Sequence, residues 1–153
     1  MKKILIAYFS ASGTTEKMAE YIAEGVRFSG QEAVTKRVED IKVATELEGY
    51  DGYIFGSPTY SLDVPELMKR FLAMAEKADL GGKMGGAFGS YTHDVGYQHD
   101  TYAPAIILKA MQSDCKMKPF ELGPFTLKED IVGISEGMKT CQDYGRVFGE
   151  KLE

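Results

Sequence analysis

The first thirty residues contain an apolar run, a polar loop and a helical pattern in direct succession. Residues 3–9, KILIAYF, are almost continuously apolar, which is typical of a β-strand that is buried on both faces of a sheet. After the polar loop, Met18, Ile22 and Val26 recur at helical spacing, and Gly30 follows them. A strand, a loop and an amphipathic helix in this order favour an α/β fold.

The rest of the chain continues this alternation. Further strands are predicted at residues 33–38, 50–56, 84–89 and in a last region formed by 117–125 and 130–134. The helices are predicted at residues 41–47, from Pro65 to the glycines at 81–82, from Pro104 onward and over the C-terminal residues. In the helix that begins with Pro65, we expect Leu67, Phe71 and Ala75 to form the buried stripe, with Met68 and Leu72 beside it.

Five strands that alternate with helices predict a doubly wound, three-layer α/β fold with a five-stranded parallel sheet, because parallel neighbours need long crossover connections. No repeat, low-complexity tract or charge block interrupts the 153 residues, so a single domain over residues 1–153 is expected. In such sheets, ligands bind beyond the carboxyl ends of the strands. The loops after the first, third and fourth strands are therefore the predicted site.

Charge and hydropathy argue against several classes of function. The chain has 18 Lys and Arg against 23 Asp and Glu, a net charge of −5, which argues against nucleic-acid binding. Its apolar stretches are too short to span a bilayer, and Lys2–Lys3 precede no signal-peptide pattern, so a cytoplasmic protein without membrane insertion is expected. Cys115 and Cys141 have no Cys or His partner at metal-ligand spacing, so we expect no metal site and two free thiols that are buried or half-buried.

The loop after the first strand, Ser10-Ala11-Ser12-Gly13-Thr14-Thr15, carries four hydroxyl groups in six residues. Before a helix N-terminus, hydroxyl and backbone N–H groups suit the oxygens of a phosphate. No Lys or Arg occurs between Lys3 and Lys17, so neutral donors would bind the anion. The alternative is an ordinary N-cap cluster. The loop matches neither G-x-G-x-x-G nor G-x-x-x-x-G-K-[ST], which argues against dinucleotide binding and a nucleoside triphosphatase. It contains no Cys or Asp, which argues against a phosphatase with a thiolate here and against a magnesium-binding phospho-acceptor pocket.

Four segments of the sequence resemble the flavodoxin family. Residues 8–19, YFSASGTTEKMA, are similar to the signature with which that family binds the phosphate of flavin mononucleotide (FMN). Residues 56–60, GSPTY, are similar to its second flavin loop, and Gly89-Ser90-Tyr91 to its third. Residues 130–133, DIVG, fall where many flavodoxins carry a similar run before the final helix. The resemblance extends over essentially the whole chain and implies a flavodoxin-like fold with FMN as cofactor.

The resemblance also implies roles for the three loops. The phosphate would be bound by Ser10, Ala11, Ser12, Gly13, Thr14 and Thr15. The rest of the flavin would contact Ser57, Pro58, Thr59 and Tyr60 on one side and Gly89, Ser90, Tyr91 and Tyr97 on the other. The chain has nine Tyr and no Trp, so tyrosines are the expected stacking partners of the ring. His93 and His99 lie in the third loop with Asp94 and Asp100, where a solvated polar loop is favoured over a proton donor.

Two functions are compatible with such a site. The resemblance implies an electron-transfer protein that passes low-potential electrons between redox partner proteins, and this is the prediction. Carrier flavodoxins commonly stabilise the one-electron-reduced flavin by flipping a glycine-containing peptide of the second loop, but residues 57–65 contain no glycine, and −5 is only mildly acidic. The alternative is an FMN-dependent NAD(P)H or quinone reductase that transfers two electrons as hydride. A third, non-redox interpretation is a flavodoxin fold whose site is empty or repurposed. An exposed patch at the flavin edge would be a surface for docking a partner protein or for forming a homodimer.

Overall fold

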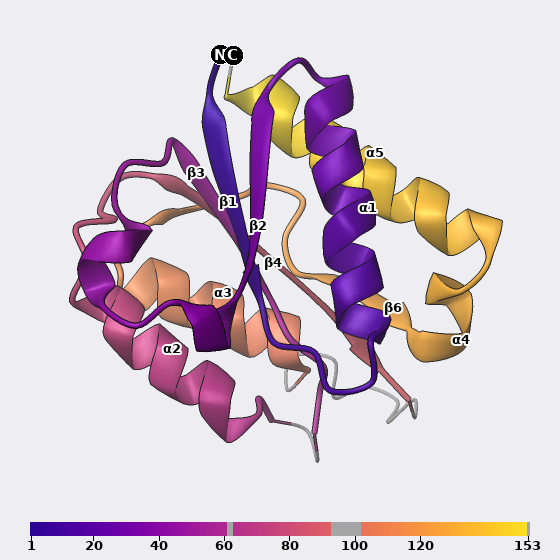
Figure 1. Ribbon diagram of the computed structural model, residues 1–153, viewed down its shortest axis with the longest axis horizontal. Helices are drawn as coiled ribbons and strands as arrows, with labels where there is room; N and C mark the ends of the chain where they lie inside the picture. Colours follow the sequence, from indigo (N-terminus) through magenta and orange to yellow (C-terminus); the bar gives the residue numbers. More distant parts are fainter. Residues whose placement is uncertain (61–62, 93–101, 153) are drawn as a thin grey trace.

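A parallel β-sheet runs through the centre of the molecule, in a computed structural model that describes residues 1–60, 63–92 and 102–152 (Figure 1). Its strands are β1 (Lys3–Tyr8), β2 (Glu32–Arg37), β3 (Gly52–Gly56), β4 (Met84–Tyr91), β5 (Lys118–Pro119) and β6 (Phe125–Lys128). The order is β2-β1-β3-β4-β5, and all of these pairs are parallel. β6 pairs with the end of β4, whereas β5 pairs with its beginning, so the two short strands share the fifth position of the sheet.

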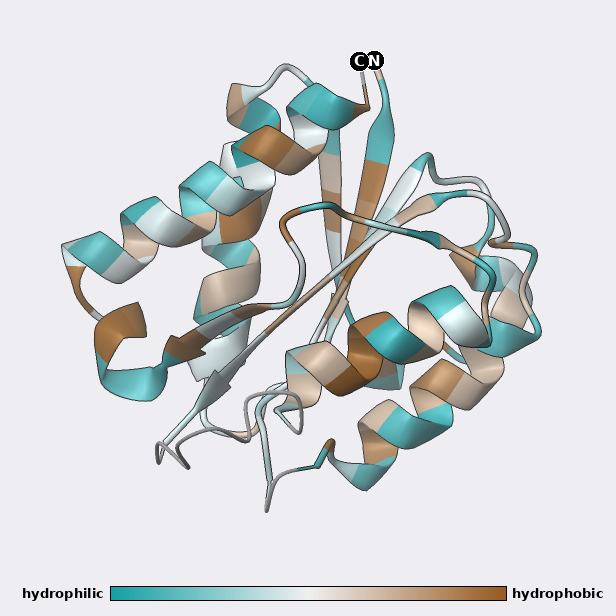
Figure 2. Cartoon of the chain, turned by 180° about the vertical axis from the view of Figure 1, so that it is seen from behind, coloured by the Kyte–Doolittle hydropathy of each residue, from teal (hydrophilic) through white to brown (hydrophobic). Residues whose placement is uncertain are grey.

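Helices cover both faces of this sheet. They are α1 (Thr14–Phe28), α2 (Glu66–Glu76), α3 (Ala103–Ser113), α4 (Glu129–Val132) and α5 (Ser135–Lys151), with the 3-10 turns η1 (Val38–Asp40) and η2 (Ala44–Leu47). α1, α4 and α5 lie on one side, and α2 and α3 on the other (Figure 1). Hydrophobic and hydrophilic residues alternate along the helices, as Figure 2 shows, because one side of each faces the sheet. The predicted three-layer, doubly wound fold is confirmed.

The central strand β1 explains why the sequence begins with an unbroken apolar run. Ile4 and Ile6 are fully buried in the core under α1 and α5, and Leu5 and Ala7 in the core under α2 and α3. Successive side chains of a strand point to opposite faces, so a strand between two helix layers needs apolar residues at every position. Each of the three larger side chains contributes about 1.5–3 kcal/mol on full burial.

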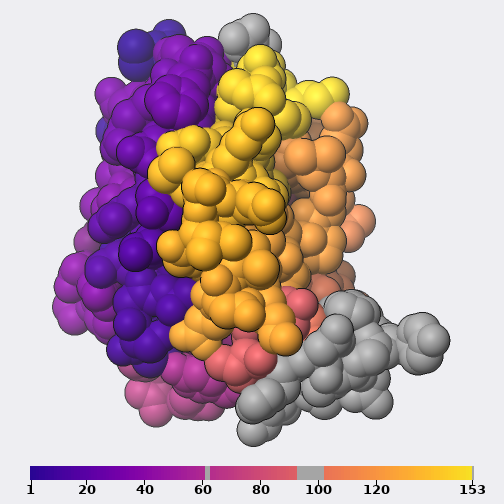
Figure 3. Space-filling model, turned by 90° about the vertical axis from the view of Figure 1, so that its right-hand side faces the viewer, coloured from indigo at the N-terminus to yellow at the C-terminus, as the bar shows by residue number. Residues whose placement is uncertain are grey.

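α1 and α5 pack against each other through glycine residues. A Cβ atom on Gly25 would lie 1.9 Å from the carbonyl oxygen of Gln142, and one on Gly145 would lie 2.0 Å from that of Ile22. In the space-filling view, the C-terminal segment in yellow and orange lies directly against the indigo and purple N-terminal segment (Figure 3). The two helix backbones therefore approach so closely that only glycine fits at these two positions.

The last strand region differs from the prediction. Residues 130–134 do not form a strand, because residues 129–132 form α4 and the strand before it is β6. Between β5 and β6 the chain leaves the sheet, and Phe120 packs there against the rings of Tyr144 and Phe148. A short apolar run is equally compatible with a strand and with one turn of helix, so hydropathy alone could not separate β6 from α4.

Two helix predictions also change. Residues 41–47 do not form an α-helix, and they contain only the 3-10 turn η2, which the 3-10 turn η1 precedes. The next helix, α2, has Pro65 as its N-cap and ends at Glu76, before the glycines at 81–82. Met68, Phe71 and Ala75 form its buried stripe, whereas Leu67 is 42% exposed. Leu67 and Met68 are neighbours in sequence, and the way that α2 docks decides which of them faces the core.

Both cysteines are buried free thiols, as predicted. Cys115 lies in the core under α2 and α3, and Cys141 in the core under α1 and α5. Burial raises the pKa of Cys115 to about 11 and that of Cys141 to about 12, because a thiolate is poorly solvated in these cores. Within the described residues, none of the helices has the length and apolar character that a membrane span requires.

The two thiols are therefore expected to resist modification in the folded protein. At pH 8 a thiol-specific chromogenic reagent should react with both of them on the order of a hundredfold more slowly than in the denatured chain, since the thiolate is the reactive form. Rate measurements with and without denaturant test this, and the denatured sample, which should yield both thiols, is the control. Fast reaction of either thiol under native conditions would show that its core opens readily.

Candidate functional site

Three predicted loops meet at the carboxyl edge of the sheet. The backbone N–H of Thr59, after β3, donates to the carbonyl oxygen of Ser90 on β4 at 2.9 Å. The hydroxyl groups of Ser90 and Thr15, both buried, lie 3.5 Å apart. The chain thus places the loop after β1, the loop after β3 and the end of β4 side by side, as expected for parallel strands whose carboxyl ends share one edge.

The first loop wraps around the hydroxyl group of Ser10. The Oγ atom of Ser10 accepts hydrogen bonds from the backbone N–H groups of Gly13, at 3.1 Å, and of Glu16, at 3.2 Å. Gly13 is the N-cap of α1 and has a φ of +93°, a left-handed conformation that favours glycine. The amides of Thr14 and Thr15 stand in the first turn of α1, where no intrahelical acceptor exists. Ser10 therefore caps the loop, and other donors remain for a ligand.

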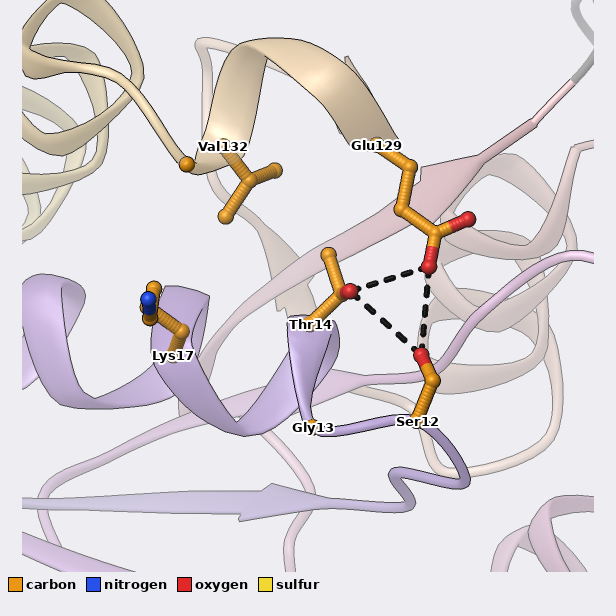
Figure 4. A pocket seen from close by; sticks show the side chains of 7 residues that line it. Ser12, Gly13, Thr14, Lys17, Glu129 and Val132 are labelled. Carbon is orange, nitrogen blue, oxygen red and sulfur yellow. Dashed lines mark hydrogen bonds between the residues drawn. The ribbon is translucent and has the colours of Figure 1, made fainter.

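A hollow of about 330 Å³ lies between this loop and α4 (Figure 4). It is lined by Ser12, Gly13, Thr14 and Lys17 from one side and by Glu129, Val132 and Gly133 from the other. The hydroxyl groups of Ser12 and Thr14 donate to Oε1 of Glu129, at 3.1 and 2.9 Å. Sequence reasoning placed neither Glu129 nor Lys17 at the site. No usable signal in the sequence pointed to Glu129, because the sequence predicts a strand over residues 130–134, whereas the structure ends β6 at Lys128 and begins α4 at Glu129.

The second loop supplies buried anchors and one exposed ring. Ser57 is fully buried and donates from its N–H to the carbonyl oxygen of Phe88 at 3.2 Å. The hydroxyl of Thr59 accepts the N–H of Ala103, at 2.9 Å, so it stabilises the start of α3. Tyr60 is 45% exposed, and its backbone pairs with that of Asp63 in a short antiparallel bridge. Thr59 therefore holds the loop in place, and Tyr60 offers an aromatic face to solvent.

The third loop begins at a point of close backbone contact. A Cβ atom on Gly89 would lie 2.1 Å from the carbonyl oxygen of Ser57, so a larger residue would push the second and third loops apart. Tyr91 is half-buried, and its ring stacks on that of Tyr102 with a centroid distance of 4.6 Å. Tyr97, His93, His99 and the two aspartates beside these histidines lie outside the described residues.

A network of hydrogen bonds and an ion pair connects the first loop to the neighbouring strands. The hydroxyl of Tyr8 donates to Oε1 of Glu16 at 3.0 Å, and Nη2 of Arg37 donates to the same oxygen at 2.7 Å. Nη1 of Arg37 also donates to the carbonyl oxygen of Ser10 at 3.5 Å. Burial, together with the hydrogen bond to Glu16, raises the pKa of Tyr8 to about 12. The network joins the ends of β1 and β2 to the start of α1, and no sequence motif pointed to it.

The donor set of this edge suits a phosphate monoester. Ser12 and Thr14 of the first loop line the hollow beside the first turn of α1, and the partial positive charge of the helix N-terminus favours an anion there. Lys17 adds a full positive charge beside the hollow. Glu129 is the exception, since its carboxylate is itself an anion.

Comparison with known proteins agrees with these observations. The sequence matches the family described as "Flavodoxin domain" over residues 5–125. A flavodoxin of Clostridium saccharobutylicum is 38% identical over 152 residues, which cover 98% of this chain and 94% of that protein. An NAD(P)H dehydrogenase (quinone) of Acidovorax ebreus is 34% identical over 124 residues, which cover 66% of this chain and 62% of the relative, so the chain spans less than two thirds of that protein.

The solved structures show the same similarity in three dimensions. Oxidised flavodoxin 1 of Bacillus cereus superimposes on this chain with a TM-score of 0.78 and 27% sequence identity, over 99% of both chains. The strand order 2-1-3-4-5 is the flavodoxin-like one. The chain belongs to the flavodoxin family.

Proposed function

We propose that this chain is a single FMN-binding domain that passes low-potential electrons between redox partner proteins. The observation that carries the proposal is the first loop, where hydroxyl groups and the backbone amides of the first turn of α1 lie beside two further loops of the same edge. Ser12, Thr14 and Thr15 would bind the phosphate of FMN, and Ser10 would keep the loop in shape. Bound FMN would supply the redox chemistry, which the side chains of this edge cannot supply themselves.

The aromatic residues of the edge suit a flat ring. Tyr60 is exposed on the second loop, and Tyr91 is half-buried on the third, where the ring of Tyr102 supports it. Aromatic rings at these two places would flank an isoalloxazine and exclude water from its faces. Ser57 and Gly89 hold the two loops at a separation that no larger residue at position 89 would allow.

A reductase is the second candidate. The second loop, residues 57–65, contains no glycine, so a peptide flip that turned a carbonyl toward the flavin would force a non-glycine residue toward positive φ. The relative from Acidovorax ebreus bears the name NAD(P)H dehydrogenase (quinone). Both observations favour an FMN-dependent NAD(P)H or quinone reductase that works in two-electron steps.

A reductive titration separates the two functions. The chain is loaded with FMN and reduced stepwise with dithionite without oxygen, while the absorbance spectrum is recorded. For a carrier we expect a large fraction of one-electron-reduced flavin at half reduction. If none accumulates, and if NAD(P)H bleaches the flavin rapidly and a quinone restores it, the reductase is the correct function. A chain that binds no FMN would contradict both.

A further inference from the structure

We propose that the carboxylate of Glu129 occupies the phosphate loop when no flavin is bound, and that the phosphate of FMN must displace it. Glu129 is the first residue of α4, on the segment that follows β6, and its side chain reaches across to the loop after β1 (Figure 4). This inference rests on the proposed function, since it requires that FMN binds at this loop. It adds a residue that sets how tightly the phosphate binds.

The hydrogen bonds of the loop cannot serve two anions at once. Oε1 of Glu129 accepts hydrogen bonds from the hydroxyl group of Ser12, at 3.1 Å, and from that of Thr14, at 2.9 Å. The Oγ1 atom of Thr14, at 3.4 Å, is a second possible acceptor for the hydroxyl group of Ser12. A hydroxyl group has one proton to donate. While Ser12 and Thr14 donate to Glu129, neither has a proton for a phosphate oxygen.

Charge gives a second, independent reason for displacement. The carboxylate of Glu129 is negative, and a phosphate monoester carries one to two negative charges near neutral pH. Two anions within hydrogen-bonding distance of the same hydroxyl groups repel each other. Lys17 lines the same hollow, so its ammonium group would attract the phosphate once the carboxylate of Glu129 has moved away.

The carboxylate therefore acts as an internal competitor of the phosphate. It keeps the loop hydrogen-bonded in the apoprotein, and FMN must break those two hydrogen bonds before it makes its own. Because both bonds involve an ionised acceptor, they are stronger than neutral ones, although Glu129 is only half-buried. We expect removal of the charge to tighten FMN binding about tenfold. The free energy of that change is smaller than the combined contribution of two hydrogen bonds to a charged group.

The test compares two flavins on four proteins. FMN and riboflavin, which lacks the phosphate, are titrated into the apo forms of the native chain, Glu129→Gln, Glu129→Ala and Asp130→Asn, and dissociation constants are read from the quenching of flavin fluorescence. Asp130→Asn is the matched control, because it removes one negative charge from the neighbouring residue, which is exposed. Circular dichroism shows whether each variant is folded. If Glu129→Gln does not fold, Glu129→Ala carries the test.

The expected result is that both Glu129 variants bind FMN about tenfold more tightly than the native chain, that Asp130→Asn does not, and that riboflavin binding is the same in all four. Unchanged or weaker FMN binding by the Glu129 variants would overturn the inference and leave the proposed function intact. So would equal tightening for riboflavin, or equal tightening by Asp130→Asn. If the native chain and the variants bind no FMN, the proposed function fails, and the inference fails with it.

Discussion

Replacement of Gly13 by valine is expected to weaken FMN binding on the order of a hundredfold. Gly13 has a φ of +93° at the N-cap of α1, and a β-branched residue is a strong outlier there. Apart from the two adjacent residues, a Cβ atom at this position would meet nothing within 4 Å, so the cost comes from the backbone conformation and not from a clash with another part of the chain. Valine would pull the loop into another conformation and turn the amides of Thr14 and Thr15 away from the phosphate.

A second substitution at the same position serves as the control. Asparagine adopts positive φ more readily than other non-glycine residues, so Gly13→Asn should lose no more than about tenfold in FMN affinity. Both variants are titrated with FMN, and their far-ultraviolet circular dichroism is compared with that of the native chain to show that α1 persists. Unchanged FMN affinity in a folded Gly13→Val protein would contradict the assignment of this loop to the phosphate.

Replacement of Gly145 by alanine is expected to lower the free energy of unfolding by about 3 kcal/mol. The new Cβ atom would lie 2.0 Å from the carbonyl oxygen of Ile22, which belongs to the backbone of α1 and cannot rotate away. By helix propensity alone the change should stabilise α5 by up to about 1 kcal/mol, since alanine favours a helix interior over glycine. A net loss would therefore show that contact between the two helix backbones outweighs propensity.

Urea unfolding curves measure this effect. The control is Gly81→Ala, whose Cβ atom would have only Lys116 within reach, at 3.9 Å from its Cβ, an ordinary contact distance. That variant should change the free energy of unfolding by less than about 0.5 kcal/mol. If Gly145→Ala has the same free energy of unfolding as the native chain, and the same slope of that free energy against urea concentration, then α1 and α5 can move apart at no cost. The close helix contact would then not contribute to stability.

Much of the fold could be predicted from local patterns. The run at residues 3–9 predicted a strand buried on both faces, and β1 is fully buried from Ile4 to Ala7. The helical spacing of Met18, Ile22 and Val26 predicted α1, and all three side chains are completely buried. These predictions succeed because a regular element that faces one core repeats its apolar residues with its own period.

Other features were out of reach because they depend on contacts between distant segments. Whether residues 130–134 form a strand depends on which part of the chain pairs with the end of β4, and that place is taken by β6. The exposure of Leu67 depends on the docking angle of α2. Thr59 is bonded to Ala103, 44 residues away, and no local pattern reveals such a pair.

The sequence by itself determined the layers of the fold, the place of the hydroxyl-rich loop before α1 and the three segments that form the edge, since these depend on short-range periodicity and on the rule that parallel strands end together. Only the tertiary structure decided what faces that loop. It brought Glu129 to Ser12 and Thr14 and joined Arg37 to Glu16. The physical reason is that a hydrogen bond or a charge interaction acts over a few ångströms of space, and separation along the chain carries no information about it.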